Sequence, residues 1–357
     1  RMTSAARQRS EAFCARFGLQ RPVLLSPMAG ACPVALSRAV TEAGGMGAMG
    51  AVLSQPDVIG AWMADLRAAG GGPAQINLWI PDPAPVRDGA AEAATRAFLA
   101  QWGPDVAAEA GDATPADFDA QCAALLAARP AVASSIMGVF PAPFVARLKA
   151  AGIAWFACAT TLDEALAAEA AGADAVVAQG FEAGGHRGAF DAANAEARAV
   201  GLFSLVPRLA DALRVPVIAA GGIADGRGIA AALTLGASAV QMGTAFLRTP
   251  EAGVSPPWAD ALARAAPEQT RLTRAFSGRP GRALATAYVR AADAPDAPPP
   301  QPYPVQRALT APMRAAAVRD DRIDAMQAWA GQSAAYAQAR PAAELVADGW
   351  RAAEALL

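Results

Sequence analysis

The chain contains 357 residues, of which 54% are apolar, so it can form a sizeable core and fits one large α/β barrel with insertions. Its formal net charge of −2 provides no general attraction to nucleic acid or to an anionic membrane, and we expect neither as a partner. The four cysteines are widely spaced, without a CxxC pair or a Cys/His cluster, which argues against a zinc site and a disulfide framework.

The N-terminal residues lack the apolar segment of a secretory signal, and the sequence has no run of about 18 apolar residues that could cross a membrane. Unpaired, widely spaced cysteines also fit a reducing compartment. We therefore expect a cytoplasmic protein.

Eight short apolar runs predict the strands of a parallel sheet that is buried on both faces, because none alternates polar with apolar residues. They cover residues 23–28, 46–52, 74–80, 131–138, 154–160, 175–180, 215–222 and 239–246. Helical patterns follow most of them, and Gly152, Gly172 and Gly236 each stand between such a pattern and the next strand, as helix C-terminal glycines do. Eight such units predict a closed (β/α)8 TIM barrel rather than an open sheet.

Two long segments interrupt this alternation. Residues 81–115 and 249–304 exceed an ordinary connection between strand and helix, and the second contains a proline-dense run at 291–300. Insertions at the C-terminal ends of barrel strands commonly form lids or substrate walls. We predict a TIM barrel at 1–248, an inserted smaller lid or substrate domain at 249–304 over the active site, and a helical segment at 305–357 that packs back on the barrel.

The only histidine, His186, lies in a glycine-rich loop that follows the strand at 175–180. A lone loop histidine is commonly just solvated. The C-terminal ends of barrel strands, however, form the catalytic face, and this loop leaves one of them. Since histidine titrates near neutral pH and glycine lets a ligand approach closely, the loop has the layout of a catalytic loop.

Other polar groups are predicted at the same face. The side-chain amides of Asn77, Gln179 and Gln241 can both donate and accept hydrogen bonds, which suits a polar heteroaromatic ring better than a metal ion. Glycines at 221, 222 and 243 end the last two strands, where barrels commonly bind phosphate, and Thr244 adds a hydroxyl. No cluster of carboxylates or histidines accompanies them, so we predict no metal site. Together these groups predict a flavin mononucleotide (FMN) site.

Several motifs in this order resemble the nitronate monooxygenases over nearly the whole chain. They are Pro27-Met28-Ala29-Gly30, Ala43-Gly44-Gly45-Met46-Gly47, Ile76-Asn77-Leu78, Gln179-Gly180, Gly184-Gly185-His186-Arg187-Gly188, Ala220-Gly221-Gly222-Ile223 and Gln241-Met242-Gly243-Thr244. Two C-terminal motifs, Tyr303-Pro304-Val305-Gln306 and Trp329-Ala330-Gly331-Gln332, resemble the bacterial class that oxidises small nitronates. Ala31 departs from the family, which often has a second glycine there.

The resemblance implies a flavin-dependent barrel enzyme with His186 as the catalytic residue. It implies FMN contacts at Met28, Ala29, Asn77, Gln179, Gly184, Gly185, Gly221, Gly222, Gln241, Met242, Gly243 and Thr244. The implied reaction is the oxidation of a small anionic nitronate, such as propionate 3-nitronate, or of a nitroalkane, by O2 to a carbonyl compound and nitrite. We expect a monomer or a homodimer.

Four aromatic residues and one arginine have alternative roles. Tyr288 and Tyr303 are candidate substrate-binding residues, although packing with one wet end explains them equally well. Trp79 and Trp155, near strand ends, are expected to pack rather than contact substrate. Arg187 is expected to be solvated or directed at a phosphate.

Two other functions remain open. One is an FMN-dependent NAD(P)H:quinone or enoyl-thioester reductase, which shares the barrel and the Gly-Gly-His loop. The other is a non-redox lyase or isomerase that uses the phosphate cradle for its substrate. A purified protein without flavin colour would favour the lyase or isomerase.

Overall fold

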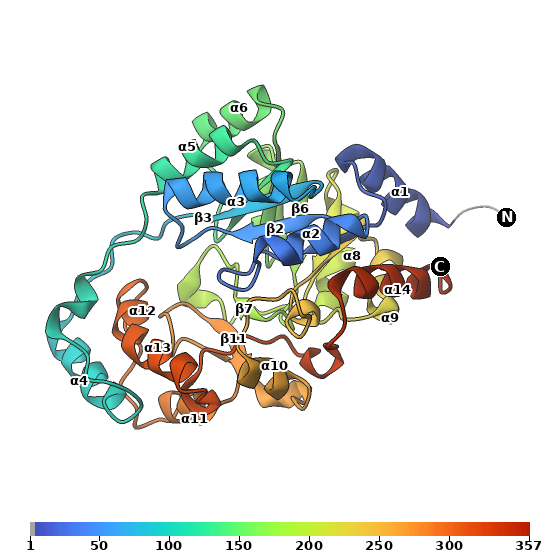
Figure 1. Cartoon of the computed structure of the whole chain (residues 1–357). Helices are drawn as coiled ribbons and strands as arrows, with labels where there is room; N and C mark the ends of the chain where they lie inside the picture. Colours follow the sequence, from blue (N-terminus) through green and yellow to red (C-terminus); the bar gives the residue numbers. More distant parts are fainter. Residues whose placement is uncertain (1–3) are drawn as a thin grey trace.

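The computed structural model describes residues 4–357, and most of them form an eight-stranded parallel barrel (Figure 1). The strands are β1 (Val23–Leu25), β2 (Gly47–Gly50), β3 (Ala74–Trp79), β4 (Val132–Ile136), β5 (Ala154–Ala159), β6 (Ala175–Gln179), β8 (Val217–Ala220) and β9 (Ala239–Met242). They pair in the order β1-β9-β8-β6-β5-β4-β3-β2, and a parallel bridge between Leu24 and Met46 closes the ring. The predicted TIM barrel and its eight strands are confirmed. The last strand is shorter than predicted, because Thr244–Phe246 is a 3-10 helix.

Helices surround this barrel. They are α2 (Val34–Glu42), α3 (Pro56–Ala68), α5 (Phe118–Ala128), α6 (Ala142–Ala150), α7 (Leu162–Ala170), α8 (Leu202–Ala212) and α9 (Gly226–Thr234). The eighth position is filled by α14 (Ala342–Glu354), which packs against α9 and α2. Among residues 4–357, no helix has the length and apolar character needed to span a bilayer.

The N-terminal helix α1 (Ala5–Phe17) helps to close one end of the barrel. Its Phe13 and Cys14 belong to a buried cluster with the interior-facing residues of the strands, among them Leu24 and Phe156. The ring of Phe17 lies 4.9 Å from that of Phe156 in an edge-on arrangement. The opposite end of the barrel, formed by the C-terminal ends of the strands, is not covered by α1 and is available for a binding site.

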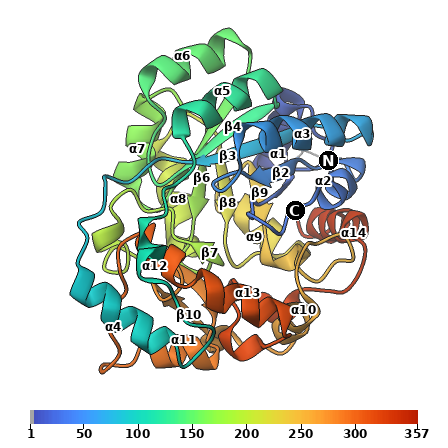
Figure 2. The same cartoon turned by 60° about the vertical axis from the view of Figure 1, so that its left-hand side comes forward.

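A smaller unit covers that opposite end (Figures 1 and 2). It contains β10 (Thr270–Thr273), β11 (Gly281–Leu284), α10 (Pro256–Leu262), α11 (Ala287–Ala292), α12 (Val305–Leu309), α13 (Ala311–Arg319), and α4 (Gly89–Leu99) from the first insertion. Short 3-10 helices lie at Ala108–Asp112, Ala192–Asn194, Pro267–Gln269, Ile323–Ala325 and Ala334–Tyr336. A second buried cluster, with Leu99, Phe276, Tyr288, Leu309 and Met313, forms its core. The helices α12 and α13 contribute to this core, whereas α14 packs against the barrel helices α9 and α2.

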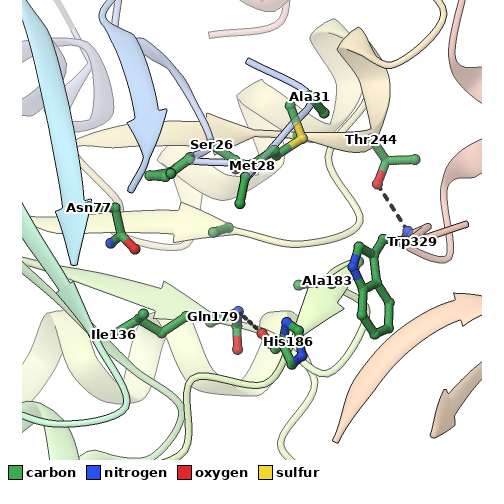
Figure 3. Close-up of a pocket in the computed structure, with 18 of the residues that line it drawn as sticks. Ser26, Met28, Ala31, Asn77, Ile136, Gln179, Ala183, His186, Thr244 and Trp329 are labelled. Carbon is green, nitrogen blue, oxygen red and sulfur yellow. Dashed lines mark hydrogen bonds between the residues drawn. The ribbon is translucent and has the colours of Figure 1, made fainter. Parts of the chain in front are cut away.

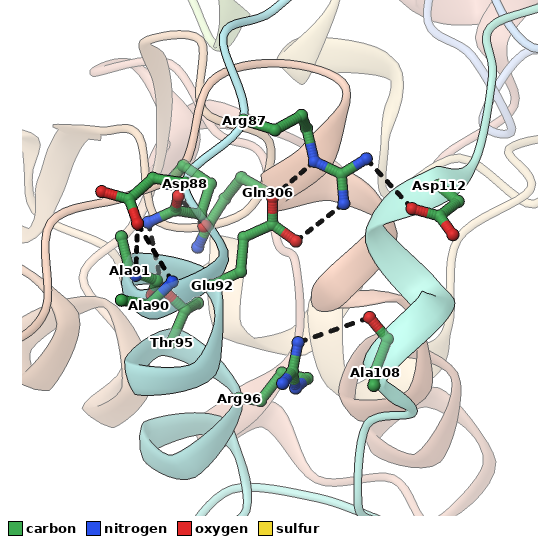
Figure 4. A network of polar contacts seen from close by, with 11 residues as sticks. Arg87, Asp88, Ala90, Ala91, Glu92, Thr95, Arg96, Ala108, Asp112 and Gln306 are labelled. Carbon is green, nitrogen blue, oxygen red and sulfur yellow. Dashed lines mark hydrogen bonds and ion pairs between the residues drawn. The ribbon is translucent and has the colours of Figure 1, made fainter.

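Polar contacts fix the first insertion in this unit (Figure 4). Arg87 forms ion pairs with the buried Glu92 and with Asp112, the latter at 3.1 Å. Asp88 caps α4 by accepting hydrogen bonds from the backbone N–H groups of residues 90 and 91 at 3.0 and 3.1 Å. Gln301 Nε2 donates to Thr95 Oγ1 at 3.3 Å, which connects α4 to the chain before α12. The first insertion is thus an ordered part of the smaller unit rather than a free loop.

Candidate active site

A cavity of about 350 Å³ lies between the C-terminal ends of the barrel strands and the smaller unit. Figure 3 shows Met28, Asn77, Gln179, His186 and Trp329 arranged around this common space. All twelve residues predicted to contact the flavin line it, as do His186 and Tyr303. Folding therefore brings the whole predicted set to one place, with Tyr288 as the exception.

Tyr288 does not line this cavity, so its predicted role as a substrate-binding residue is not supported. Its side chain is 1% exposed in the core of the smaller unit, and its hydroxyl donates to the Ala275 carbonyl at 2.9 Å. Trp79, by contrast, lines the cavity, and its ring lies 4.7 Å from that of His186. Trp155 packs as predicted, in the core.

The amide groups fall into two sets. In the first set, both amide atoms of Gln179 form hydrogen bonds within the loop that carries His186. Its Nε2 donates to the His186 carbonyl at 3.0 Å, and its Oε1 accepts from Gly188 N at 2.8 Å. Asn77 Nδ2 donates to Ser134 Oγ at 3.0 Å, and Gln241 Oε1 accepts from Gln75 Nε2 at 2.9 Å. These contacts leave an amide oxygen of Asn77 and an amide nitrogen of Gln241 for a ligand.

Gln75 was missed by sequence reasoning, although it is fully buried and lines the cavity. Its Nε2 donates to Leu25 O at 3.1 Å and to Gln241, but its Oε1 is buried without a hydrogen-bond partner. An orphaned buried acceptor is costly unless a donor reaches it. The N–H group of a flavin ring is such a donor, so the residues present fit the cofactor.

The glycines at the ends of β8 and β9 leave room for a ligand beside the backbone. Gly221 and Gly222 have φ values of +112° and +70°, which side chains rarely adopt, and a Cβ at Gly221 would lie 2.9 Å from Ala183 N. Thr244 Oγ1 accepts a hydrogen bond from Gly331 N at 3.0 Å, so it joins this region to the C-terminal segment. Gly221, Gly222, Gly243 and Thr244 thus line one cavity, and their role as a phosphate cradle stays a prediction.

His186 belongs to a two-residue strand, β7 (Gly185–His186), that pairs with β11 of the smaller unit. Its Nε2 lies 2.7 Å from Ser277 Oγ, and the Trp79 and Trp329 rings enclose it at 4.7 and 4.8 Å. The Ser277 hydroxyl donates its only proton to the Arg279 carbonyl at 3.2 Å. It therefore accepts from His186, so Nε2 carries the ring proton and Nδ1 is the free base.

Burial, and after it the positive charges of Arg279, Arg307 and Arg314, together lower the pKa of His186 from 6.5 to about 3. The ring is therefore neutral at neutral pH. A neutral imidazole leaves the cavity positive for an anion, and an anion bound beside the ring would offset the cations that weaken it as a proton acceptor.

A pH titration tests this environment, and because the chain has one histidine, its imidazole resonance needs no assignment. We expect no shift of the Cε1 proton between pH 8 and 5. Below pH 6.5 the His186 imidazole binds a proton in the unfolded chain but not in the folded protein. The unfolding free energy should therefore fall by about 1.4 kcal/mol per pH unit toward pH 3. His186→Asn should lack this component. A midpoint near 6.5 in the folded protein would contradict an enclosed ring.

Arg187 takes neither of its expected positions. It is 1% exposed, lies outside the cavity lining, and donates to Gly180 O at 2.6 Å and Gln179 O at 3.3 Å. Its guanidinium therefore stabilises the start of the loop that carries His186, by hydrogen bonds to two backbone carbonyls. The cations that do line the cavity are Arg307 and Arg314, which sequence reasoning missed. The position of Arg307, four residues after the candidate Tyr303, was the available signal.

Comparisons with known proteins agree with this arrangement. The family model for nitronate monooxygenase matches residues 11–348. A nitronate monooxygenase of Paraburkholderia phytofirmans is 40% identical over 93% of this chain and 92% of its own, and that of Pseudomonas aeruginosa is 40% identical over 94% and 97%. The crystal structure of nitroalkane oxidase from Streptomyces ansochromogenes superposes with a TM-score of 0.86 at 37% identity, over 96% of this chain and 99% of that one. FabK from Thermotoga maritima has a TM-score of 0.75 at 27% identity, over 97% and 96%.

Proposed function

The chain belongs to the nitronate monooxygenase family and is therefore a flavin-dependent oxidoreductase of nitronates; we propose that its flavin is FMN and that its oxidant is O2. The products would be a carbonyl compound and nitrite. The observation that carries the proposal is the neutral, enclosed His186 beside unpaired amide groups in a cationic cavity. This combination suits an anionic substrate next to a heteroaromatic ring.

The FMN ring would be held by Asn77, Gln75 and Gln241, whose unused amide atoms match a ring edge with alternating donors and acceptors. Its phosphate would lie at Gly221, Gly222 and the Gly243-Thr244 turn. When bound, the flavin supplies the oxidation–reduction chemistry, and the protein orients it and excludes water. The residues of the chain would thus bind the flavin and position it.

His186 is proposed to act on protons. With Nε2–H held by Ser277, its Nδ1 can take the α-proton from a neutral nitroalkane, which generates the nitronate in place. Trp79 and Trp329 keep the ring in position and exclude water. An added nitronate needs no such step, and the cations of the cavity would bind it directly.

Anaerobic mixing tests the reaction class. The purified protein is expected to be yellow, and propionate 3-nitronate alone should bleach the flavin spectrum, whereas NADH should not. Bleaching by NADH alone would make the protein a flavin reductase, an activity for which the similarity to FabK leaves room. A colourless protein that binds no added FMN would favour a non-redox barrel enzyme instead.

A further inference from the structure

A second cavity, of about 500 Å³, lies beside the cavity that contains His186. It is lined mainly by residues between 80 and 87 and between 111 and 118, in and beside the first insertion, and by residues 303–305 at the start of α12. Of the residues that the structure describes, only Val52, Trp79 and Tyr303 line both cavities. These three residues form a partition between the first cavity, around His186, and the second.

The aromatic side chains of Trp79 and Tyr303 provide most of this partition. Their ring centroids are 5.4 Å apart, a distance at which aromatic rings are in contact, and the Trp79 ring also lies 4.7 Å from that of His186. Trp79 ends β3 of the barrel, whereas Tyr303 belongs to the smaller unit, two residues before α12. Contact between the two units therefore closes the first cavity beside His186.

The second cavity is mostly apolar, and its charged groups are already paired. Apolar side chains, many of them proline, form most of its lining. Of its charged residues, Asp82 forms a bidentate ion pair with Arg279 at 2.7 Å, and Arg87 and Asp112 pair with each other at 3.1 Å. An ionic ligand would therefore find no unpaired charge there, whereas a hydrocarbon chain could bury its surface.

The first cavity leaves little room for a long substrate beside a flavin. Twelve of its lining residues are the predicted flavin contacts, so the substrate is left with the space next to His186 and its two tryptophans. A chain that extends from a nitronate carbon toward the second cavity meets the Trp79 ring first. The partition therefore sets a limit on that side.

We propose that Trp79 and Tyr303 determine the chain length of the substrate: by closing off the second cavity, they restrict the enzyme to short alkyl nitronates. This inference rests on the proposed function and names the residues that limit its substrate range. With either ring removed, the two cavities become continuous, and a longer chain gains an apolar place to lie. Burial of one methylene group contributes about 0.8 kcal/mol, which is roughly 4-fold in affinity.

Two unbranched substrates, propyl 1-nitronate and octyl 1-nitronate, test the partition through the ratio of their kcat/KM values. Trp79→Ala should raise the octyl-to-propyl ratio by roughly 60-fold, the effect of three buried methylene groups at roughly 4-fold each. Tyr303→Ala should also raise it, and Trp79→Phe, which keeps a ring, should raise it by less. Activity with propyl nitronate falls in Trp79→Ala because this ring also encloses His186, and the ratio cancels that loss.

Trp329→Ala is the matched control. The Trp329 ring lies 4.8 Å from that of His186, about as close as Trp79, but it lines only the first cavity. Its loss should lower activity with both nitronates and leave their ratio within about 3-fold of wild type. An equal rise of the ratio in both tryptophan variants would overturn the proposal, as would an unchanged ratio in Trp79→Ala and Tyr303→Ala.

Refilling the second cavity tests whether the chain lies there. Ala116 lines this cavity but not the first, and it is only partly buried, so the position has room for a larger side chain. Ala116→Phe added to Trp79→Ala should return the ratio toward that of wild type, and persistence of the full gain would contradict the proposal. If Trp79→Ala does not retain flavin, the same measurements in Tyr303→Ala, which leaves β3 intact, decide the question.

Binding of unreactive anions separates this inference from the proposed reaction. Butyrate and octanoate have a planar anionic group with two oxygens, as a nitronate has, but no nitronate to oxidise. Octanoate should raise the Tm of the Trp79→Ala flavoprotein more than that of wild type, and butyrate should not, since a ligand of the folded state stabilises it according to its affinity. Equal octanoate shifts in the two proteins would overturn the partition, whatever the reaction. The expected difference in a protein whose flavin no nitronate bleaches would support the partition while the proposed function fails.

Discussion

Replacing His186 with asparagine is expected to lower turnover of a nitroalkane by roughly two or more orders of magnitude, the usual scale for loss of a general base. Asparagine keeps a polar side chain that can contact Ser277 but cannot take a proton near neutral pH. The backbone pairing of residue 186 with Gly281 does not involve the side chain and should persist. Steady-state kinetics with nitroethane, together with the visible spectrum of the variant, measure the effect.

Flavin content and folding are the controls for this variant. Both should match wild type, because the His186 ring contacts Ser277, Trp79 and Trp329, and none of these three is a predicted flavin contact. Near-wild-type turnover with a full flavin complement would remove His186 from the mechanism. Loss of flavin would instead give it a binding role.

Replacing Gly184 with alanine is expected to lower the unfolding free energy by about 3 kcal/mol and to release most of the flavin. The added Cβ would lie 2.5 Å from Gly331 N and 2.7 Å from the Ala330 carbonyl carbon, and neither backbone atom can yield as a flexible side chain could. The loop before His186 would therefore separate from the C-terminal segment. Denaturant unfolding and flavin content after gel filtration measure the two effects.

The neighbouring Gly185 provides the matched control. Its φ of +74° strains any other residue, but an added Cβ would meet no atom within 4 Å. Gly185→Ala should therefore cost only about 1 kcal/mol and retain flavin. If the two variants are equally stable, close contact at Gly184 is not what limits this position.

The sequence predicts the barrel well because its strands are uniformly apolar and its helices end at glycines such as Gly152 and Gly236. Residues at strand ends, such as Asn77 and Gln241, follow from that assignment, since every parallel strand delivers its C-terminal end to the same face. Gln75 could not be predicted in this way. It lies within a strand of buried residues, and the sequence gives no sign that its amide oxygen lacks a hydrogen-bond partner.

Contacts between the barrel and the smaller unit were beyond sequence reasoning. Ser277 lies about 90 positions after His186, and only the pairing of β7 with β11 brings them together. Tyr288 and Tyr303 look alike in sequence, yet one donates its hydroxyl inside a core and the other faces the cavity. Such outcomes depend on how two units pack, which neither periodicity nor composition encodes.

The pairing of β7 with β11 also has a consequence for biosynthesis. All eight barrel strands have been synthesised once Met242 has been added, but Ser277, Gly281 and Trp329 follow later, the last by about 90 residues. At about 5–20 residues per second this delay lasts roughly 4–18 s. During that time His186 lacks its strand partner Gly281, the Ser277 hydroxyl beside Nε2 and one of its two neighbouring tryptophans, Trp329. The barrel strands can therefore pair during synthesis, whereas the eighth outer helix, α14, and the complete surroundings of His186 have to wait for the chain made afterwards.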